Sequence, residues 1–172
     1  MADGFLCRAM RACDIEDVIR IQAEAYRDEI IESVEVIQTR FAQTPDTSWV
    51  VESTEGNVRG YLVGYYSHLG EVTPWGQNFS HKPSADTLYL HDLAISKSAA
   101  GYGLGQLLVT HALQEASARA LVSAALVSVQ NSKVFWEKLG FNEYTDLPTI
   151  QQQRLASYSG PAFYMSRRLA EI

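Results

Sequence analysis

Cysteine and histidine are scarce in this chain of 172 residues, which has two cysteines and four histidines. Cys7 and Cys13 lie close together with no second pair, so a framework of disulfides is not expected and reduced, partly buried thiols are. With so few histidines near the cysteines, a zinc site has no support either. The sequence therefore predicts neither a disulfide-stabilised protein nor a metalloprotein.

Long apolar runs and basic clusters are also missing. No apolar stretch approaches the length of a membrane span, and residues 1–11 lack the apolar core of a signal peptide. The net charge is −6, and the sequence has no basic cluster larger than the pairs Arg167 with Arg168 and Lys133 with Lys138. We therefore expect no membrane or nucleic-acid partner and a cytoplasmic location. The negative balance suits a cationic acceptor such as an amine, but it is also a common charge for solubility.

The bulk composition is that of an ordinary soluble globular protein, with 47% hydrophobic and 20% charged residues. A chain of this length forms one domain with a full-sized core, so a single domain is expected over residues 1–172. Hydrophobic periodicity predicts strands at 5–10, 48–53, 58–68, 88–95, 124–129, 141–144 and 162–169. It predicts helices at 15–26, with Asp14 as N-cap, and at 34–41, 104–118 and 132–139. Residues 69–85 read as a long irregular loop.

Three glycines on alternate positions, Gly101, Gly103 and Gly105, join the strand at 88–95 to the helix at 104–118. Such a turn gathers backbone N–H groups at the positive end of a helix dipole, which is a phosphate site. Glycine takes positive φ and lets the backbone approach a pyrophosphate closely. Gln106 after the third glycine fits neither a P-loop nor a dinucleotide fingerprint. A tight strand-to-helix turn without a ligand is the alternative interpretation.

A second constellation follows in residues 129–144, with Asn131, Trp136 and the ending Leu139-Gly140-Phe141. Together with Gly103-Leu104-Gly105, it resembles the GNAT superfamily of N-acetyltransferases. Members of that family have a strand leading into Arg/Gln-x-x-Gly-x-Gly/Ala. About 25 to 30 residues later they have an Asn, a short helix with an aromatic residue and a Leu-Gly-Phe ending. The order of elements agrees with the family from Phe5 to about Leu169.

The resemblance implies a GNAT fold of the α/β (α+β) class. This fold is a mixed, mostly antiparallel central sheet of six to seven strands flanked by about four helices. Acyl-CoA would lie where the strand at 88–95 splays from the strand at 124–129, and its pantetheine arm would bond to backbone groups of Leu93, Ala94 and Ile95. The family also implies a diphosphate site at Ala100, Gly101, Tyr102, Gly103, Leu104 and Gly105.

Two residues depart from the family pattern. Ala100 replaces the Arg or Gln of the turn, which removes a side-chain contact to phosphate but leaves the N–H groups, so weakened CoA binding is expected. Trp136 replaces a tyrosine that can protonate the departing CoA thiolate, and an indole cannot give up its proton in this way. Trp136 packs either beside the thioester or in the core. Asn131 can hold a pantetheine amide or cap the following helix.

The candidate bases are Asp92 and His91, at the end of the strand at 88–95. Strand alternation puts them on opposite faces, so one of them interrupts an apolar face, where an ionisable group is costly unless it is paired. Each is either a catalytic base or part of a hydrogen bond that fixes a loop. Tyr144 is a weaker candidate for the acid. The oxyanion is expected on a backbone N–H between Leu93 and Ile95.

The sequence thus predicts transfer of an acetyl group from acetyl-CoA to a primary amine, by direct attack in a ternary complex and without a metal. The first alternative is a catalytically inactive acyl-CoA-binding module, suggested by Ala100 and Trp136. The second is an unrelated α/β nucleotide-binding protein. A polyamine, an amino acid, an antibiotic and a protein N-terminus or lysine all stay open as acceptors. The family resemblance also implies a possible homodimer.

Overall fold

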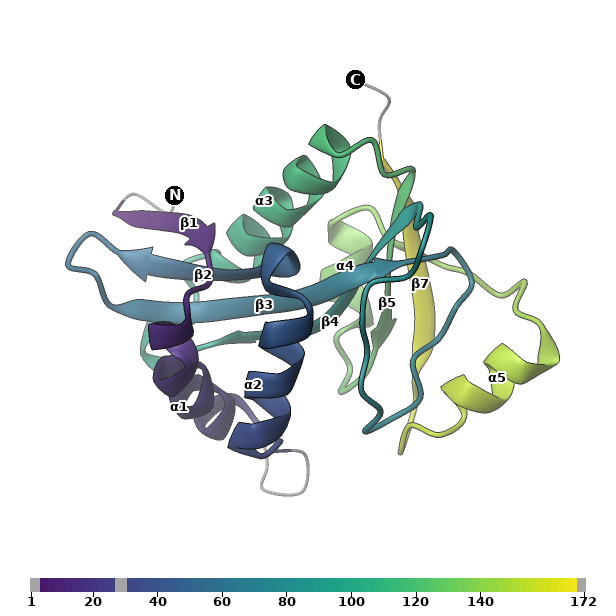
Figure 1. Ribbon diagram of the computed structural model, residues 1–172, viewed down its shortest axis with the longest axis horizontal. Coiled ribbons are helices and arrows are strands. Elements are labelled where there is room, and N and C mark those ends of the chain that lie inside the picture. The colour runs from purple at the N-terminus through teal and green to yellow at the C-terminus, as the bar shows by residue number, and fades with distance from the viewer. Residues whose placement is uncertain (1–3, 27–30, 170–172) are drawn as a thin grey trace. The chain divides into compact units, whose positions relative to one another are not determined.

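The computed structural model describes residues 4–26 and 31–169. Its strands form a seven-stranded sheet in the order β1-β2-β3-β4-β5-β7-β6. Figure 1 draws the strands as arrows and the helices as coiled ribbons. The strands are β1 Phe5–Ala9, β2 Ser48–Ser53, β3 Val58–Ser67, β4 Thr87–Ile95, β5 Ser123–Ser128, β6 Asn142–Glu143 and β7 Phe163–Arg168. The helices are α1 Ile15–Ala25, α2 Val34–Gln43, α3 Leu104–Ala118, α4 Lys133–Lys138 and α5 Thr149–Leu155. Short 3-10 turns lie at Ala12–Asp14, Pro45–Thr47 and Lys97–Ala99.

The sheet is mixed and mostly antiparallel, which confirms the predicted fold class. Strands β4 and β5 pair in parallel, whereas β1 with β2, β2 with β3, β5 with β7 and β6 with β7 pair antiparallel. Helix α5 was not predicted from the sequence. Its residues include three glutamines and none is buried, so it has no apolar stripe that periodicity can detect.

The chain forms two compact units. One contains residues 1–64 and 92–112, and the other contains residues 65–91 and 113–172. The borders fall inside β3, β4 and α3 instead of in a linker. The single domain over residues 1–172 stays a prediction.

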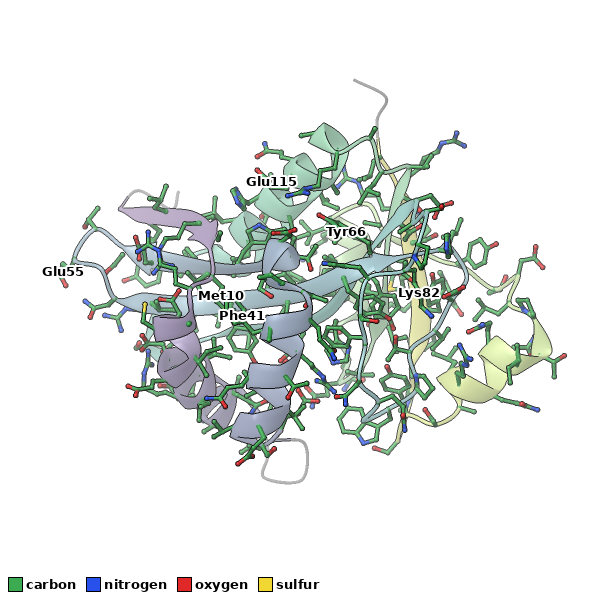
Figure 2. All side chains as sticks on the ribbon, in the orientation of Figure 1. Met10, Phe41, Glu55, Tyr66, Lys82 and Glu115 are labelled. Atoms are coloured by element: carbon green, nitrogen blue, oxygen red, sulfur yellow. The ribbon has the colours of Figure 1, made fainter. Side chains whose placement is uncertain are left out.

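The core of the first unit lies between its two N-terminal helices and strands β2 and β3. Ile21 from α1 and Ile37 from α2 belong to one buried cluster with Val50 of β2. Met10 and Phe41, labelled in Figure 2, are part of the same packing. The amphipathic faces expected for the two helices are therefore used against the sheet.

The opposite face of β2 is covered by α3. Trp49 precedes Val50 on the strand, so its side chain points to the other side of the sheet. There its ring meets His111 of α3 edge-on, with 6.4 Å between the ring centroids. His111 is a half-buried packing residue.

Helix α4, in the second unit, ends in a Schellman motif. Gly140 has φ of +82°, its N–H donates to the carbonyl of Glu137, and the N–H of Phe141 donates to the carbonyl of Trp136. Gly140 is therefore the C′ residue of α4. The motif turns the chain from α4 directly into β6.

Asp14 does not cap α1 with its side chain, contrary to the prediction. The residue is itself helical, with φ of −82° and ψ of −9°, because a 3-10 turn precedes the helix. Its carboxylate turns back and accepts the Arg11 N–H at 2.7 Å and two Arg8 nitrogens at 2.7 and 2.9 Å. Arg8 also donates to Glu52 at 2.8 Å, so the network joins β1, the turn and β2.

Replacing Asp14 by Asn should lower the free energy of unfolding by about 2 kcal/mol at neutral pH, because the largely buried Arg8 loses its charged partner. Burial opposes ionisation of Asp14, but the bonds from Arg8 and Arg11 outweigh it and lower its pKa. A lowered carboxyl pKa stabilises the fold above the unfolded pKa of about 3.9 and loses that effect as the pH falls through the folded value. Urea titrations should therefore show the difference between the two proteins closing below about pH 4.

Asp17→Asn is the matched control for this prediction, since Asp17 pairs with Arg20 at an exposed position. It should change the free energy of unfolding by less than about 1 kcal/mol. An equal loss for Asp14→Asn and Asp17→Asn would show that the Arg8 network contributes nothing special.

Three structural findings bear on membrane, metal and thiol chemistry. Within residues 4–26 and 31–169, no helix is long and apolar enough to cross a membrane. The same residues contain no group of three or more His, Cys, Asp or Glu side chains that could hold a metal ion. Both cysteines are free, Cys13 is exposed, and burial raises the pKa of the half-buried Cys7 to about 11. Cys7 is therefore an unreactive thiol near neutral pH.

Candidate active site

The glycine turn lies between β4 and α3, within the first unit. Gly101 and Gly103 have φ of +86° and +76°, a region that only glycine enters without strain. A Cβ added at either position would meet nothing within 4 Å, so the requirement for glycine comes from the backbone conformation and not from a steric neighbour. Gly105 lies in the first turn of α3.

Six consecutive backbone N–H groups of this turn have no acceptor in the part of the chain that the structure describes. They belong to Gly101, Tyr102, Gly103, Leu104, Gly105 and Gln106. The first N–H of α3 that is bonded is that of Leu107, which donates to Gly103 at 3.1 Å. The N–H of Ala100 donates to Lys97 at 3.3 Å, so the run begins one residue later than the sequence suggests. Such a run at a helix N-terminus is an anion-binding arrangement.

The segment before the turn is fixed to α1 and β3. The carboxylate of Glu24 accepts the Ser96 hydroxyl at 2.7 Å and the Lys97 N–H at 3.0 Å. The Ser96 N–H donates to the carbonyl of Arg59 on β3 at 2.8 Å. The bond from Ser96, followed by those from Lys97 and Arg20, lowers the pKa of Glu24. The glycine turn therefore starts from an anchored position.

Asp92, a predicted base, is held by two tyrosines of the first unit. Tyr26, directly after α1, donates to its Oδ1 at 2.6 Å, and Tyr61 of β3 donates to its Oδ2 at 2.7 Å. The hydroxyl of Tyr26 also lies 3.0 Å from the carbonyl oxygen of Leu93. Burial raises the pKa of Asp92, although both tyrosines and the charge of Arg40 act in the other direction. Asp92 is therefore a carboxyl group that takes up a proton more readily than an exposed one.

An ion pair from the segment around α2 adds to this cluster. Arg40 is buried and donates to the carboxylate of Glu32. Burial raises the pKa of Glu32, Arg40 lowers it and the charge of Asp92 raises it further. The carboxyl groups of Asp92 and Glu32 therefore act on each other's ionisation, with Arg40 as the neighbouring cation.

His91 turns to a different neighbour, as strand alternation requires. Its ring packs against Phe79 with 4.7 Å between centroids, and Phe79 stacks on Tyr65 of β3 at 4.5 Å. Phe79 belongs to the loop at 69–85, which contains no helix or strand. The two candidate bases thus have different neighbours: aromatic rings of the second unit for His91, and the polar cluster of the first unit for Asp92.

Tyr144, the candidate acid, is half-buried beside Tyr164, with 5.9 Å between the rings. Its N–H donates to the carbonyl of Tyr164 at 2.9 Å. No described residue accepts from or donates to its hydroxyl. The hydroxyl is therefore available to another group.

Trp136 and Asn131 belong to the second unit. Trp136 is buried, with its ring edge-on to Phe135 and Phe141, which supports the interpretation as a core residue. Asn131 is exposed and does not cap α4, because the N-cap position is Ser132. Gln130 and Asn131 both have positive φ, +54° and +59°, an uncommon conformation for two successive residues other than glycine. Strain of this kind concentrates at functional sites.

The backbone of β4 changes its pairing along its length. Its parallel register with β5 runs from Thr87 to Leu90, although β4 continues to Ile95. The three predicted pantetheine contacts, Leu93, Ala94 and Ile95, lie beyond that register. Ala94 is buried in the core cluster of the first unit.

Sequence patterns do not predict four residues of the Asp92 cluster: Tyr26, Tyr61, Glu32 and Arg40. Both tyrosines occupy positions that periodicity assigns to packing, and a hydroxyl partner does not alter that pattern. Glu32 and Arg40 sit eight residues apart, and no local motif joins them. An ionisable Asp in an apolar strand was the one available signal that partners had to exist.

Comparison with known protein families gives a match over residues 15–141 to the acetyltransferase (GNAT) family. This chain belongs to the GNAT acetyltransferase family. The match includes the glycine turn, Asp92 and the segment from Asn131 to Phe141. The sequence-based resemblance is confirmed.

Solved structures place this GNAT protein among others of the same fold. Ard1 from Thermoplasma volcanium has 21% identity and a TM-score of 0.73, over 98% of this chain and 99% of that one. The GphF GNAT-like decarboxylase in complex with isobutyryl-CoA has 15% identity and a TM-score of 0.76, over 96% and 100%. The PaiA N-acetyltransferase of Thermoplasma acidophilum in complex with coenzyme A has 15% identity and a TM-score of 0.68, over 95% and 98%. A search of curated protein sequences finds no match.

Proposed function

We propose that this GNAT protein transfers an acetyl group from acetyl-CoA to a primary amine, by direct attack in a ternary complex. The observation that carries the proposal is the run of six N–H groups without an acceptor in the glycine turn of a member of this family. A diphosphate presents several oxygens to such a run, and the helix dipole favours its charge. A family relative of the same fold is described in complex with coenzyme A.

In this proposal the residues Gly101 to Gln106 hold the diphosphate of CoA, and the pantetheine arm runs along Leu93, Ala94 and Ile95. The end of the β4 register at Leu90 supports this placement, because peptide-like amides of pantetheine can then pair with backbone groups of β4. Ala100 offers neither a polar side chain nor a free N–H to the phosphates. We therefore expect CoA affinity to depend on the backbone of the turn.

The chemistry needs a neutral amine, a stabilised oxyanion and a protonated leaving group. We assign proton removal from the amine to Asp92, because burial raises the pKa of this carboxyl group, which makes it a better proton acceptor than an exposed carboxylate. A backbone N–H between Leu93 and Ile95 would stabilise the oxyanion. The CoA thiolate, with a thiol pKa of about 8.5, accepts a proton from water or from Tyr144, whose hydroxyl has no partner among the described residues.

The acceptor is proposed only as a class, a small-molecule or peptide primary amine. The cytoplasmic location and the homodimer stay predictions. A GNAT-like decarboxylase has the same fold, so the fold by itself does not give the reaction. Transfer to an amine therefore has to be measured directly.

The decisive experiment incubates the purified chain with acetyl-CoA and a panel of polyamines, amino acids, aminoglycosides and peptides with free N-termini or lysines. The expected result is CoA release that requires both the protein and one amine class, with the acetylated amine identified by mass. Tight CoA binding without transfer to any amine would favour the inactive acyl-CoA-binding module. Stabilisation against heating by ATP or NAD but not by CoA would favour an unrelated nucleotide site.

A further inference from the structure

The hydroxyl of Tyr26 faces two acceptors at once. It lies 2.6 Å from Oδ1 of Asp92 and 3.0 Å from the carbonyl oxygen of Leu93. A phenol has one proton to donate, so it serves one of these acceptors at a time. Tyr61 differs, because the hydrogen bond of its hydroxyl goes to Oδ2 of Asp92 alone.

These distances let both tyrosine hydroxyls and both carboxyl oxygens of Asp92 keep a hydrogen bond in either protonation state of Asp92. When the carboxyl is ionised, Tyr26 and Tyr61 each donate to one of its oxygens. When Oδ1 carries a proton, it donates to the Tyr26 oxygen, and the Tyr26 hydroxyl turns to the carbonyl of Leu93. Neither state leaves a proton of Tyr26, Tyr61 or Asp92 without an acceptor, and an unsatisfied buried donor would cost about 1–3 kcal/mol.

We propose that Tyr26 is a positioning residue that enables Asp92 to take up and release a proton, by turning its hydroxyl between Asp92 and the carbonyl of Leu93. This inference rests on the proposed function, in which Asp92 removes the proton of the attacking amine. That proton ends on Oδ1, and the proton of Tyr26 stays on its own oxygen but changes acceptor. Release of the proton from Asp92 to water restores the first arrangement.

The other groups around Asp92 favour its charged form to different degrees. Tyr61, on β3, donates to Oδ2 in both states, and its bond is stronger to a carboxylate than to a neutral acid. Arg40, on α2, favours the ionised form, and Glu32, its ion-pair partner, opposes it. Burial favours the neutral form most of all. Tyr26 alone bonds to the carboxyl in one state and to a backbone carbonyl in the other.

The two tyrosines form a matched pair for an experiment on the free protein. Tyr61→Phe removes a bond that chiefly stabilises the carboxylate, so it should raise the pKa of Asp92 by about one unit. Tyr26→Phe removes a partner of both states, so the rise should be less than half as large. The pKa is read from the carboxyl ¹³C resonance of Asp92, assigned with Asp92→Asn. A rise for Tyr26→Phe equal to or larger than that for Tyr61→Phe overturns the proposal.

A second measurement needs no variant and so does not depend on whether Tyr26→Phe folds. In the wild-type protein, the hydroxyl proton of Tyr26 should shift upfield as Asp92 becomes protonated, because its acceptor changes from a carboxylate to a carbonyl. An unchanged shift across the Asp92 titration contradicts the turning hydroxyl. Both experiments use the protein without substrate, so they decide this inference even if no amine is acetylated.

Activity supplies a third, independent measurement. Tyr26→Phe should lower kcat about 10-fold or more with little change in the KM for acetyl-CoA, whereas Tyr61→Phe should mainly move the acidic limb of the pH profile upward. Equal effects of both variants on KM and kcat would indicate a merely structural role for Tyr26. Loss of transfer in the wild-type protein would instead remove the proposed function.

Discussion

Replacing Asp92 by Asn should lower kcat by about 10²- to 10⁴-fold, the range expected when a general base is removed. The amide keeps the size of the side chain and can still bond to Tyr26 and Tyr61, but it cannot take up the proton of the amine. The KM for acetyl-CoA should change little, because the CoA contacts proposed above are backbone groups. Steady-state kinetics with the acceptor identified in the panel measure both constants.

Stability distinguishes this role from a structural one. Burial raises the folded-state pKa of Asp92, so its ionisation destabilises the fold. Stability from such a group is fully present below the unfolded pKa of about 3.9 and is lost as the pH rises through the folded value. At neutral pH Asp92→Asn should therefore match or exceed the wild type in free energy of unfolding. A carboxylate kept only for structure would give a less stable variant with unchanged turnover per folded molecule.

His91→Gln is the companion variant. His91 packs on Phe79 and has a different set of neighbours from Asp92, so its loss should leave kcat within about tenfold of the wild type. The opposite outcome, with a large loss for His91→Gln and none for Asp92→Asn, would transfer the role of base to His91. Unchanged kcat in both variants would remove both residues from the mechanism.

Replacing Gly101 and Gly103 together by Ala should weaken CoA binding by about 100-fold. Each alanine is strained at positive φ by about 1–2 kcal/mol, and a turn that relaxes from this conformation no longer directs its N–H groups to one anion. Neither added Cβ meets another atom within 4 Å, so the effect reports backbone conformation and not a clash. Isothermal titration with CoA measures the change.

The control is the double variant Gly56→Ala, Gly160→Ala. These glycines have φ of +81° and +79° and open space at the Cβ position, so the strain matches that in the glycine turn. They lie in the β2–β3 turn and in the segment before β7. The control should lose stability to a similar degree and keep its affinity for CoA. Equal weakening in both double variants would mean that general destabilisation, and not the turn, lowers the affinity.

Sequence patterns predicted most elements because each carries a local signal. The hairpin of β2 and β3 has alternating strands around a Glu-Gly-Asn turn, and α3 follows a glycine-rich turn with apolar residues at helical spacing. Helix α5 lacks an apolar stripe and was missed. Asp14 was expected to cap the helix with its side chain, because a carboxylate before a helix fits a cap. Its ion pair with Arg8, which also binds Glu52 of β2, depends on the pairing of β1 with β2 and has no local sequence signal.

The candidate site likewise has a part with a local sequence signal and a part that only the tertiary structure reveals. Its proposed phosphate-binding part is a contiguous segment, Gly101 to Gln106, so three glycines in the sequence were enough to propose it. Asp92 was found because a carboxylate in an apolar strand needs a partner. The partners themselves come from the end of α1 and from β3, 66 and 31 residues away along the chain. Only the tertiary structure brings those hydroxyl groups to Asp92.

The claim on which the account depends is that the backbone of the glycine turn binds the diphosphate of CoA. An NMR titration that follows each backbone amide tests it directly, with pantetheine, which lacks the diphosphate, as the comparison ligand. CoA should give saturable changes in chemical shift that are largest for the amides of Gly101 through Gln106. Pantetheine should leave the chemical shifts of those six amides unchanged. The proposal would be contradicted if CoA changed the chemical shifts of other amides but not of these six, or if CoA did not bind at all.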